Sequence, residues 1–112
     1  MASKQSTVDF ILDQLTAAGV VTARKMFGDY ALYCNGKVVG LICDDTLYIK
    51  ITEPGTIFVG NHYKEGYAYN GAKVSMCIDG DLIEDRQWIS DLVRITADNL
   101  PYPKPKKLKK NE

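Results

Sequence analysis

The sequence has few of the residues from which most catalytic and metal sites are built. It contains one histidine, His62, and three cysteines, Cys34, Cys43 and Cys77, with no C-x-x-C pair. A histidine-rich metal site is therefore excluded, and Ser–His or Cys–His catalysis would have to use His62. We expect His62 on an exposed loop and the cysteines as reduced structural thiols. The sequence predicts no catalytic residue, cofactor site or metal site.

Long apolar runs and nucleotide-binding motifs are absent as well. No stretch approaches the roughly 20 apolar residues of a membrane span, and none resembles the apolar part of a secretion signal. No glycine-rich segment has phosphate-loop or dinucleotide spacing. Asp44-Asp45 and Asp79-Gly80-Asp81 lack the spacing of a calcium-binding loop and are typical of turns. We therefore expect a cytoplasmic protein that is not an enzyme and does not associate with membranes.

The composition is that of an ordinary globular domain, with an unusual end. Of 112 residues, 46% are hydrophobic and 25% are charged, and the formal net charge is zero. The zero is a balance between a mildly acidic body and a basic tail. The tail lysines are Lys104, Lys106, Lys107, Lys109 and Lys110, interspersed with prolines. We predict one domain over residues 1–100 and a disordered, Pro/Lys-rich tail over 101–112.

Hydrophobic periodicity predicts a helix at each end of this domain. Val8, Ile11, Leu12 and Leu15 follow Ser6, a favoured N-cap residue, at helical spacing, and Gly19 can end the helix. This predicts a helix over residues 6–18. A second apolar stripe follows Asp85, another favoured N-cap residue, and predicts a helix over 85–99. A short helix over 56–64 is weakly indicated.

Between the helices the pattern is extended. Strands are predicted over 26–34, 38–43 and 46–51, joined by turns at Asn35-Gly36 and Asp44-Asp45 into a three-stranded meander. Glu53-Pro54-Gly55 should end the meander, and a further strand is predicted over 74–78. The predicted fold class is therefore α+β, an antiparallel sheet of the meander plus one or more further strands, packed by the N- and C-terminal helices.

Two-residue turns would fix which side chains share a face of the sheet. The face covered by helices would then carry Ala31, Tyr33, Val38, Gly40, Ile42, Leu47, Ile49 and Ile51. The other face would carry Tyr30, Leu32, Val39, Leu41 and Tyr48, together with Cys43, Lys37 and Lys50. If loops cover this second face incompletely, it becomes a candidate partner-binding surface, and a homodimer is its simplest form. The alternative, that a loop covers these side chains as core, stays open.

One segment is distinctive enough to suggest a family. Residues 24–33, Arg-Lys-Met-Phe-Gly-Asp-Tyr-Ala-Leu-Tyr, resemble the R-x-M-F-G-G-Y-G-L-Y signature of the TfoX/Sxy N-terminal domain. The similarity continues through Asn35-Gly36-Lys37, the strand Asp44–Lys50, Val74-Ser75-Met76 and the acidic segment 82–85. Asp29, Ala31 and Cys77 depart from the family pattern. Longer family members also carry a second, helical domain, and this chain ends in a basic tail instead.

The resemblance implies an α+β domain linked to transcriptional regulation of bacterial competence for DNA uptake. The leading functional hypothesis is therefore a non-enzymatic regulatory module that binds another protein, such as a transcription factor, or a second copy of itself. The second hypothesis is direct, weak nucleic-acid binding through Arg24, Lys25 and the five tail lysines. The family brings no catalytic residues to transfer. The sequence leaves open the partner's identity, the genes affected and the oligomeric state.

Overall fold

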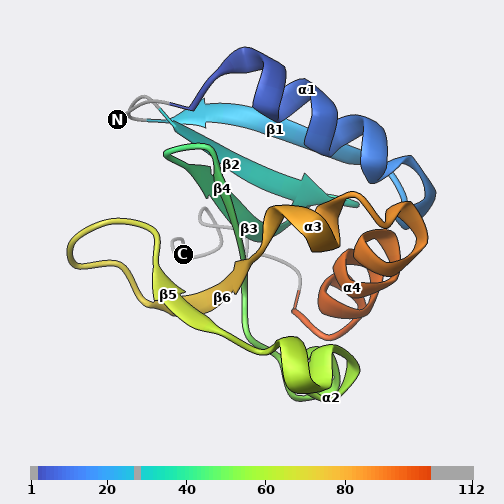
Figure 1. The fold of residues 1–112 in the computed structure, drawn as a ribbon. Coiled ribbons are helices and arrows are strands. Elements are labelled where there is room, and N and C mark those ends of the chain that lie inside the picture. Colours follow the sequence, from blue (N-terminus) through green and yellow to red (C-terminus); the bar gives the residue numbers. More distant parts are fainter. Residues whose placement is uncertain (1–2, 27–28, 102–112) are drawn as a thin grey trace, which may run out of the picture.

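The described chain folds into one antiparallel sheet, with helices before, between and after its strands in the sequence (Figure 1). The structure is a computed structural model, and it describes residues 3–26 and 29–101. The helical elements are α1 (Gln5–Gln14), a 3-10 turn at Thr16–Ala18, α2 (Glu53–Val59), a 3-10 turn at Gly60–His62, α3 (Gly80–Ile83) and α4 (Arg86–Asp98). The strands are β1 (Val21–Met26), β2 (Asp29–Cys34), β3 (Lys37–Cys43), β4 (Thr46–Ile49), β5 (Glu65–Tyr67) and β6 (Val74–Ile78). In these residues the strand order is β1-β2-β3-β4-β6-β5, every neighbouring pair is antiparallel, and the predicted α+β class is confirmed.

The two turns of the meander have the predicted geometry. Asn35 and Gly36 have φ angles of 54° and 85°, and Asp44 and Asp45 have 51° and 60°. Two consecutive residues with positive φ form the turn whose twist matches that of the strands it joins. Asparagine, aspartate and glycine tolerate this conformation better than other residues, which is why both hairpins could be predicted.

The helix ends were predicted with mixed success. The carboxylate of Asp85 accepts a hydrogen bond from the backbone N–H of Trp88 at 3.1 Å, so it caps α4 as predicted. The predicted cap at Ser6 is wrong. Helix α1 begins one residue earlier, its N-cap is Lys4, and no side chain caps it. Gly19 follows the 3-10 turn with a φ of 140°, which a residue with a Cβ rarely adopts.

Three further boundaries differ from the prediction. Residues 21–26 form a strand of their own, β1. This strand pairs antiparallel with β2 and is not an extension of it. Strand β5 lies in a segment predicted as loop, and it pairs with β6 at the other edge of the sheet. Pro54 lies in the first turn of α2, where its missing N–H costs nothing, and the hydroxyl of Thr52 accepts a hydrogen bond from Gly55 at 3.1 Å. Glu53-Pro54-Gly55 therefore starts a helix as well as ending the meander.

A β-bulge changes the predicted faces of the sheet. Tyr33 pairs with Val38, but Leu32 pairs with Gly40, so Val39 has no partner on β2 and the register shifts by one residue. Before the bulge, every side chain of β2 consequently lies on the opposite face from the one predicted. Between β3 and β4 the predicted register is confirmed, with Leu41 opposite Tyr48.

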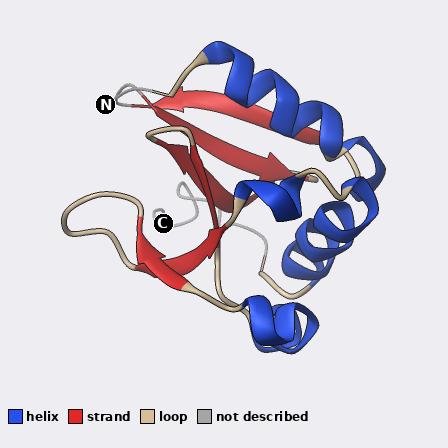
Figure 2. Ribbon diagram, viewed as in Figure 1, coloured by secondary structure: helices blue, strands red, loops and turns tan. Residues whose placement is uncertain are grey.

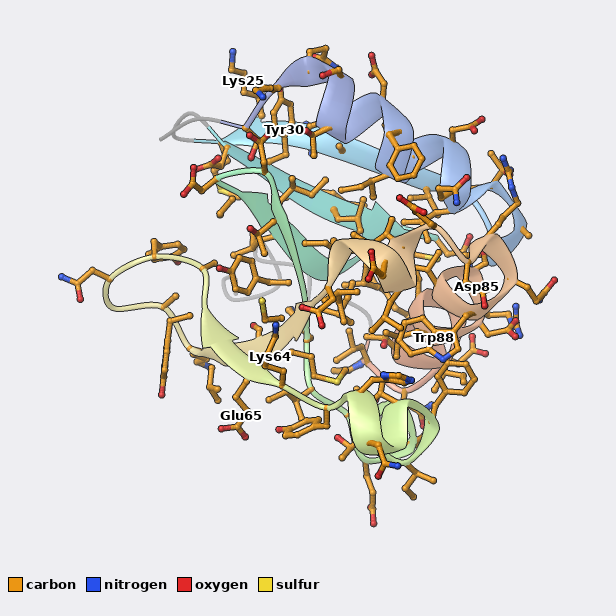
Figure 3. The ribbon with its side chains drawn as sticks, in the orientation of Figure 1. Lys25, Tyr30, Lys64, Glu65, Asp85 and Trp88 are labelled. Atoms are coloured by element: carbon orange, nitrogen blue, oxygen red, sulfur yellow. The ribbon has the colours of Figure 1, made fainter. Side chains whose placement is uncertain are left out.

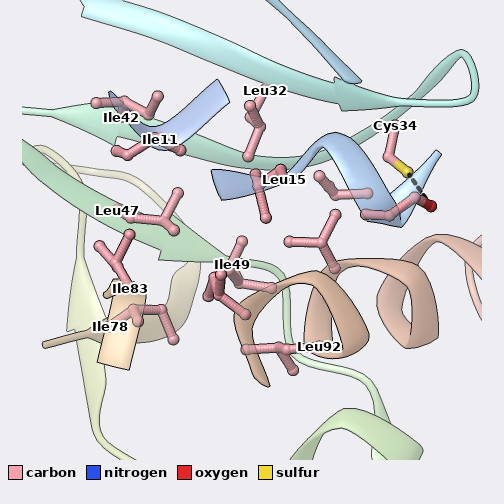
Figure 4. Close-up of a cluster of buried hydrophobic side chains, with 14 of the residues drawn as sticks. Ile11, Leu15, Leu32, Cys34, Ile42, Leu47, Ile49, Ile78, Ile83 and Leu92 are labelled. Atoms are coloured by element: carbon pink, nitrogen blue, oxygen red, sulfur yellow. Dashed lines mark hydrogen bonds between the residues drawn. The ribbon is translucent and has the colours of Figure 1, made fainter. Parts of the chain in front are cut away.

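The bulge allows β3 to bury two residues that plain alternation would separate. Val39 and Ile42 are both fully buried in the same cluster. Figure 2 shows the helices on one side of the sheet, and Figure 4 shows aliphatic side chains from α1, α3 and α4 meeting those of the strands there. The largest fully buried side chains are Val8, Ile11, Leu15, Leu32, Val39, Ile42, Leu47, Ile49, Met76, Ile89, Leu92 and Val93. The core therefore lies between the helices and the one face of the sheet that they cover.

Polar contacts tie the helical layer together. The side-chain amide of Gln14, buried at the end of α1, donates to the carbonyl oxygens of Ile83 and Glu84 at 2.9 and 3.2 Å. The hydroxyl of Ser90 on α4 donates to the carbonyl oxygen of Gln14 at 2.9 Å. Trp88 on α4 is partly buried and packs against the core. Its ring packs 5.5 Å from that of Phe58 and 6.0 Å from that of His62, which is exposed as predicted.

Candidate partner-binding face

The opposite side of the sheet carries a row of side chains that no described helix covers. Strand pairing aligns Arg24 with Ala31, Ala31 with Leu41, Leu41 with Tyr48, and Tyr48 with Cys77. Residues paired across antiparallel strands point to the same side, so these five form one row across five strands. The residues Tyr33, Val38 and Cys43 lie beside this row on the same side of the sheet. We call the row and these three neighbours the open face.

The open face is apolar and aromatic, and it is partly accessible to solvent. Tyr33, Val38, Leu41, Tyr48 and Cys77 are partly buried, whereas Ala31 and Cys43 are 1% and 5% exposed. The guanidinium carbon of Arg24 lies 5.8 Å from the centre of the Tyr33 ring, a cation–π contact that covers one edge of the face. Side chains of this kind are typical of interface cores.

Two hollows lie on this side of the sheet. One, of about 340 Å³, is lined by Met26, Asp29, Tyr30, Leu41, Cys43 and Tyr69. The other, of about 890 Å³, is bordered by Val38, Gly40, Leu41, Lys50, Ile51, Tyr69, Leu100 and residues 71–75. Leu41 and Tyr69 line both hollows, so the two are neighbours. Tyr69, 60% exposed, belongs to the loop between β5 and β6, which extends away from the helices (Figure 1).

Strand β5 supports one end of the row. A Cβ on Gly66 would lie 3.2 Å from both the Tyr48 ring and the Cβ of Cys77, so glycine allows β5 to approach these side chains closely. Burial raises the pKa of the Tyr48 hydroxyl, and negative charge at Cys77, Cys43 and Asp44 would act in the same direction. Tyr48 is therefore a neutral hydrogen-bonding group on an apolar surface.

The N-terminal segment closes the end of the sheet where β3 turns into β4. One carboxylate oxygen of Asp29 accepts hydrogen bonds from the backbone N–H and the hydroxyl of Ser3, both at 3.0 Å, and from the N–H of Asp44 at 3.2 Å. The carboxylate of Asp45 accepts from the N–H of Lys4 at 2.8 Å, and this bond lowers its pKa. Asp29, which departs from the family pattern, therefore links the N-terminal segment to the turn between β3 and β4.

The predicted partner-binding set is only partly on this face. Leu41 and Tyr48 lie there, as predicted. Leu32 and Val39 are fully buried in the core on the other side, and placing them on the surface was wrong because the bulge was not foreseen. Tyr30 packs against the core, and its hydroxyl donates to the side chain of Gln5 on α1 at 3.1 Å. Tyr33 and Val38, predicted to face the helices, replace them.

The predicted nucleic-acid residues do not form one patch in the described residues. Arg24 pairs with Ala31 on the open face, whereas Lys25 pairs with Tyr30 and lies on the helix side, at the α1 end of the sheet (Figure 3). Successive residues of a strand point to opposite faces, and this separates the two charges. The tail lysines 104, 106, 107, 109 and 110 lie outside the described residues.

The described residues offer little for catalysis. No group of three or more His, Cys, Asp or Glu side chains among them is placed to hold a metal ion. Burial raises the pKa of the Cys34 and Cys43 thiols, which favours the unreactive protonated form. All three cysteines are free. None of the described helices is long and apolar enough to cross a membrane.

The fold defines a class of small α+β proteins with helices on one side of an antiparallel sheet and a face without a helical cover in the described residues on the other. Comparison with known proteins gives the family. The sequence pattern of the TfoX N-terminal domain matches residues 13–100, and the chain belongs to this family.

The chain is also 41% identical over 109 residues to a protein of Spirochaeta aurantia described as an uncharacterized 12.7 kDa protein in the trpE 5′ region. The match covers 97% of this chain and 93% of that protein. The TfoX N-terminal domain is not a known enzyme family.

Proposed function

We propose that this protein is a non-enzymatic regulatory module that acts in the cytoplasm by binding a protein partner through the open face. The observation that carries the proposal is the row from Arg24 to Cys77, where partly exposed apolar and aromatic side chains lie on a sheet face without a helical cover in the described residues. Large apolar patches on soluble proteins commonly mark interaction sites.

The family gives this binding activity a context. TfoX/Sxy proteins are linked to transcriptional regulation of competence, so we propose that the complex formed through the open face takes part in transcriptional regulation. The free thiols are consistent with a reducing compartment. No acid–base pair or activated nucleophile on the open face supports an enzymatic role.

Direct nucleic-acid binding is the weaker candidate. Arg24 is engaged with Tyr33, and Lys25 lies on the other side of the sheet. Carboxylates at Asp29 and Asp44 stand at one end of the open face and would repel phosphate groups. Any nucleic-acid binding would then depend on the tail and fall steeply with salt.

Photo-crosslinking in cells tests the proposal directly. A photoreactive phenylalanine analogue replaces Val38 on the open face or, as the matched control, Gln87 on the exposed side of α4. We expect discrete protein adducts from position 38 that are absent from position 87. Leu41→Glu should abolish them without changing the circular dichroism spectrum, and should alter the same transcripts as deletion of the gene.

Equal adduct yields from both positions would contradict the proposal. Adducts with nucleic acid from position 38 would favour the second candidate function instead.

A further inference from the structure

Charge is distributed unevenly along the open face. Lys50 directly follows β4, and Lys73 directly precedes β6, which runs antiparallel to β4, so both lysines lie at the same end. Both border the larger hollow. They are exposed, and no carboxylate side chain borders that hollow. This end of the face is cationic.

The other end is anionic. Asp44 lies in the turn before β4, and Asp29 lines the smaller hollow. Burial is the main cause that raises the pKa of Cys43 and of Tyr48, and the carboxylate of Asp44 adds to both shifts, so Asp44 lies near these two residues of the open face. Asp44 and Asp45 form the turn before β4, and four steps of extended chain lead from Thr46 to Lys50. At about 3.3 Å per residue, the lysine end therefore lies about 13 Å beyond the start of β4, next to this turn. Leu41, which borders both hollows, lies between the two ends.

A surface that carries opposite charges at its two ends is complementary to itself. When two copies meet face to face about a two-fold axis that runs across the strands, strand directions reverse. The lysine end of each copy then lies over the carboxylate end of the other. Leu41 and Tyr48 of the two copies would lie near the axis, where apolar and aromatic contacts carry most of the binding energy.

We propose that the partner of the open face is a second copy of this chain, packed antiparallel with Lys50 and Lys73 of each copy against Asp29 and Asp44 of the other. This inference rests on the proposed function, because it uses the same face. A second copy is favoured because one surface supplies both halves of each charge pair, and an unrelated partner would need a matching dipole of its own.

The test uses two charge reversals, Lys50→Glu and Asp44→Lys, with mass measured by analytical ultracentrifugation. The wild-type chain should sediment at twice its 12.5 kDa mass. Each variant alone should dimerise at least about tenfold more weakly, because like charges then face each other at both ends. An equimolar mixture should recover the dimer, since one copy is then anionic and the other cationic at both ends.

Matched controls separate this effect from a general change of charge. Lys25→Glu and Glu84→Lys alter exposed residues away from the open face and should dimerise like the wild type. Asp44 has a positive φ, which lysine adopts poorly, so Asp44→Asn with Lys50→Gln serves as a second pair. These neutral variants should fold normally and show a reduced dependence of dimerisation on salt.

A wild-type chain that stays monomeric at millimolar concentration would overturn the dimer. So would a mixture of the two charge-reversed variants that fails to associate although both are folded. If position 38 still gives specific adducts with another protein, only the dimer is rejected. If position 38 gives no adducts either, the proposed function fails with it.

Discussion

The two faces of the sheet use the same kinds of residue for different purposes. On the helix side, Leu32 is fully buried among side chains from several elements. On the open side, Leu41 is partly exposed and borders two hollows. The two leucines lie on neighbouring strands, and their residue type does not distinguish them. What differs is whether another layer covers the face, so burial and not composition separates core from candidate interface.

The largest expected effect compares these two leucines directly. Leu32→Ala should lower the free energy of unfolding by about 2–5 kcal/mol, because it leaves a cavity in a close-packed core. Leu41→Ala should cost less than about 1 kcal/mol, because its side chain is partly in water already. Urea denaturation of the two purified variants, at a concentration low enough for the chain to be monomeric, measures both values. Equal losses would show that the open face is also core.

The second effect concerns the bulge that separates the faces. A Cβ on Gly40 would overlap the carbonyl oxygen of Tyr48, so Gly40→Ala should cost about 3 kcal/mol as β3 and β4 are forced apart. At Gly80, a Cβ meets nothing within 4 Å, and Gly80→Ala should be neutral or stabilising by up to about 1 kcal/mol. Thermal unfolding compares the two. A harmless Gly40→Ala would contradict the strand spacing described above.

The third effect concerns the helices that cover one face. Asp85→Ala removes the N-cap of α4 and should cost about 1 kcal/mol. Ser6→Ala should change stability by less than about 0.5 kcal/mol, since Ser6 is exposed and does not cap α1. Chemical denaturation distinguishes this result from the expectation based on sequence, in which both substitutions remove a cap. A similar loss for both would restore Ser6 as the cap.

The smallest effect is a dependence of stability on alkaline pH. Burial raises the pKa of the Cys34 thiol above its ordinary value of 9.0, and Asp98 adds to this. Because the thiol ionises less readily in the folded chain, its contribution to the free energy of unfolding is fully present below pH 9.0. This contribution is lost as the pH rises through the pKa of Cys34 in the folded state. The loss per thiol cannot exceed about 1.4 kcal/mol per pH unit.

Unfolding under reducing conditions at pH 8, 9 and 10 measures this slope. Cys34→Ala should make the slope shallower, even though the variant itself is less stable. An unchanged slope would show that Cys34 ionises as easily in the folded chain as in the unfolded one.

The secondary structure was predictable wherever local chemistry decides it. Asn35-Gly36 and Asp44-Asp45 form the expected turns because few residues accept two positive φ angles in succession. Val74–Ile78 is the predicted strand, and Asp85 is the predicted cap. The edge strands β1 and β5 were missed, because exposed edges carry charged residues and glycine and so lack the alternation that marks a half-buried strand.

The candidate site was predictable only in part. Leu41 and Tyr48 follow from the Asp44-Asp45 turn, which fixes the register of β3 against β4. Tyr30, Leu32 and Val39 do not, because the register of β2 depends on the bulge at Val39. A useful signal was present in the sequence: Gly40, inside an otherwise apolar strand, is the kind of residue that marks a bulge or a close backbone approach.

By itself the sequence determined the family resemblance, the fold class, both two-residue turns and the α4 cap, because each depends on residues close together in the chain. Only the tertiary structure decided which face of the sheet is the core. That choice depends on one extra residue in β3, since side chains alternate with a period of two and a single insertion exchanges the faces. That Lys50 and Lys73 lie at the same end of the open face is likewise a product of tertiary structure, because it depends on the pairing of β4 with β6, two segments that are distant in the sequence.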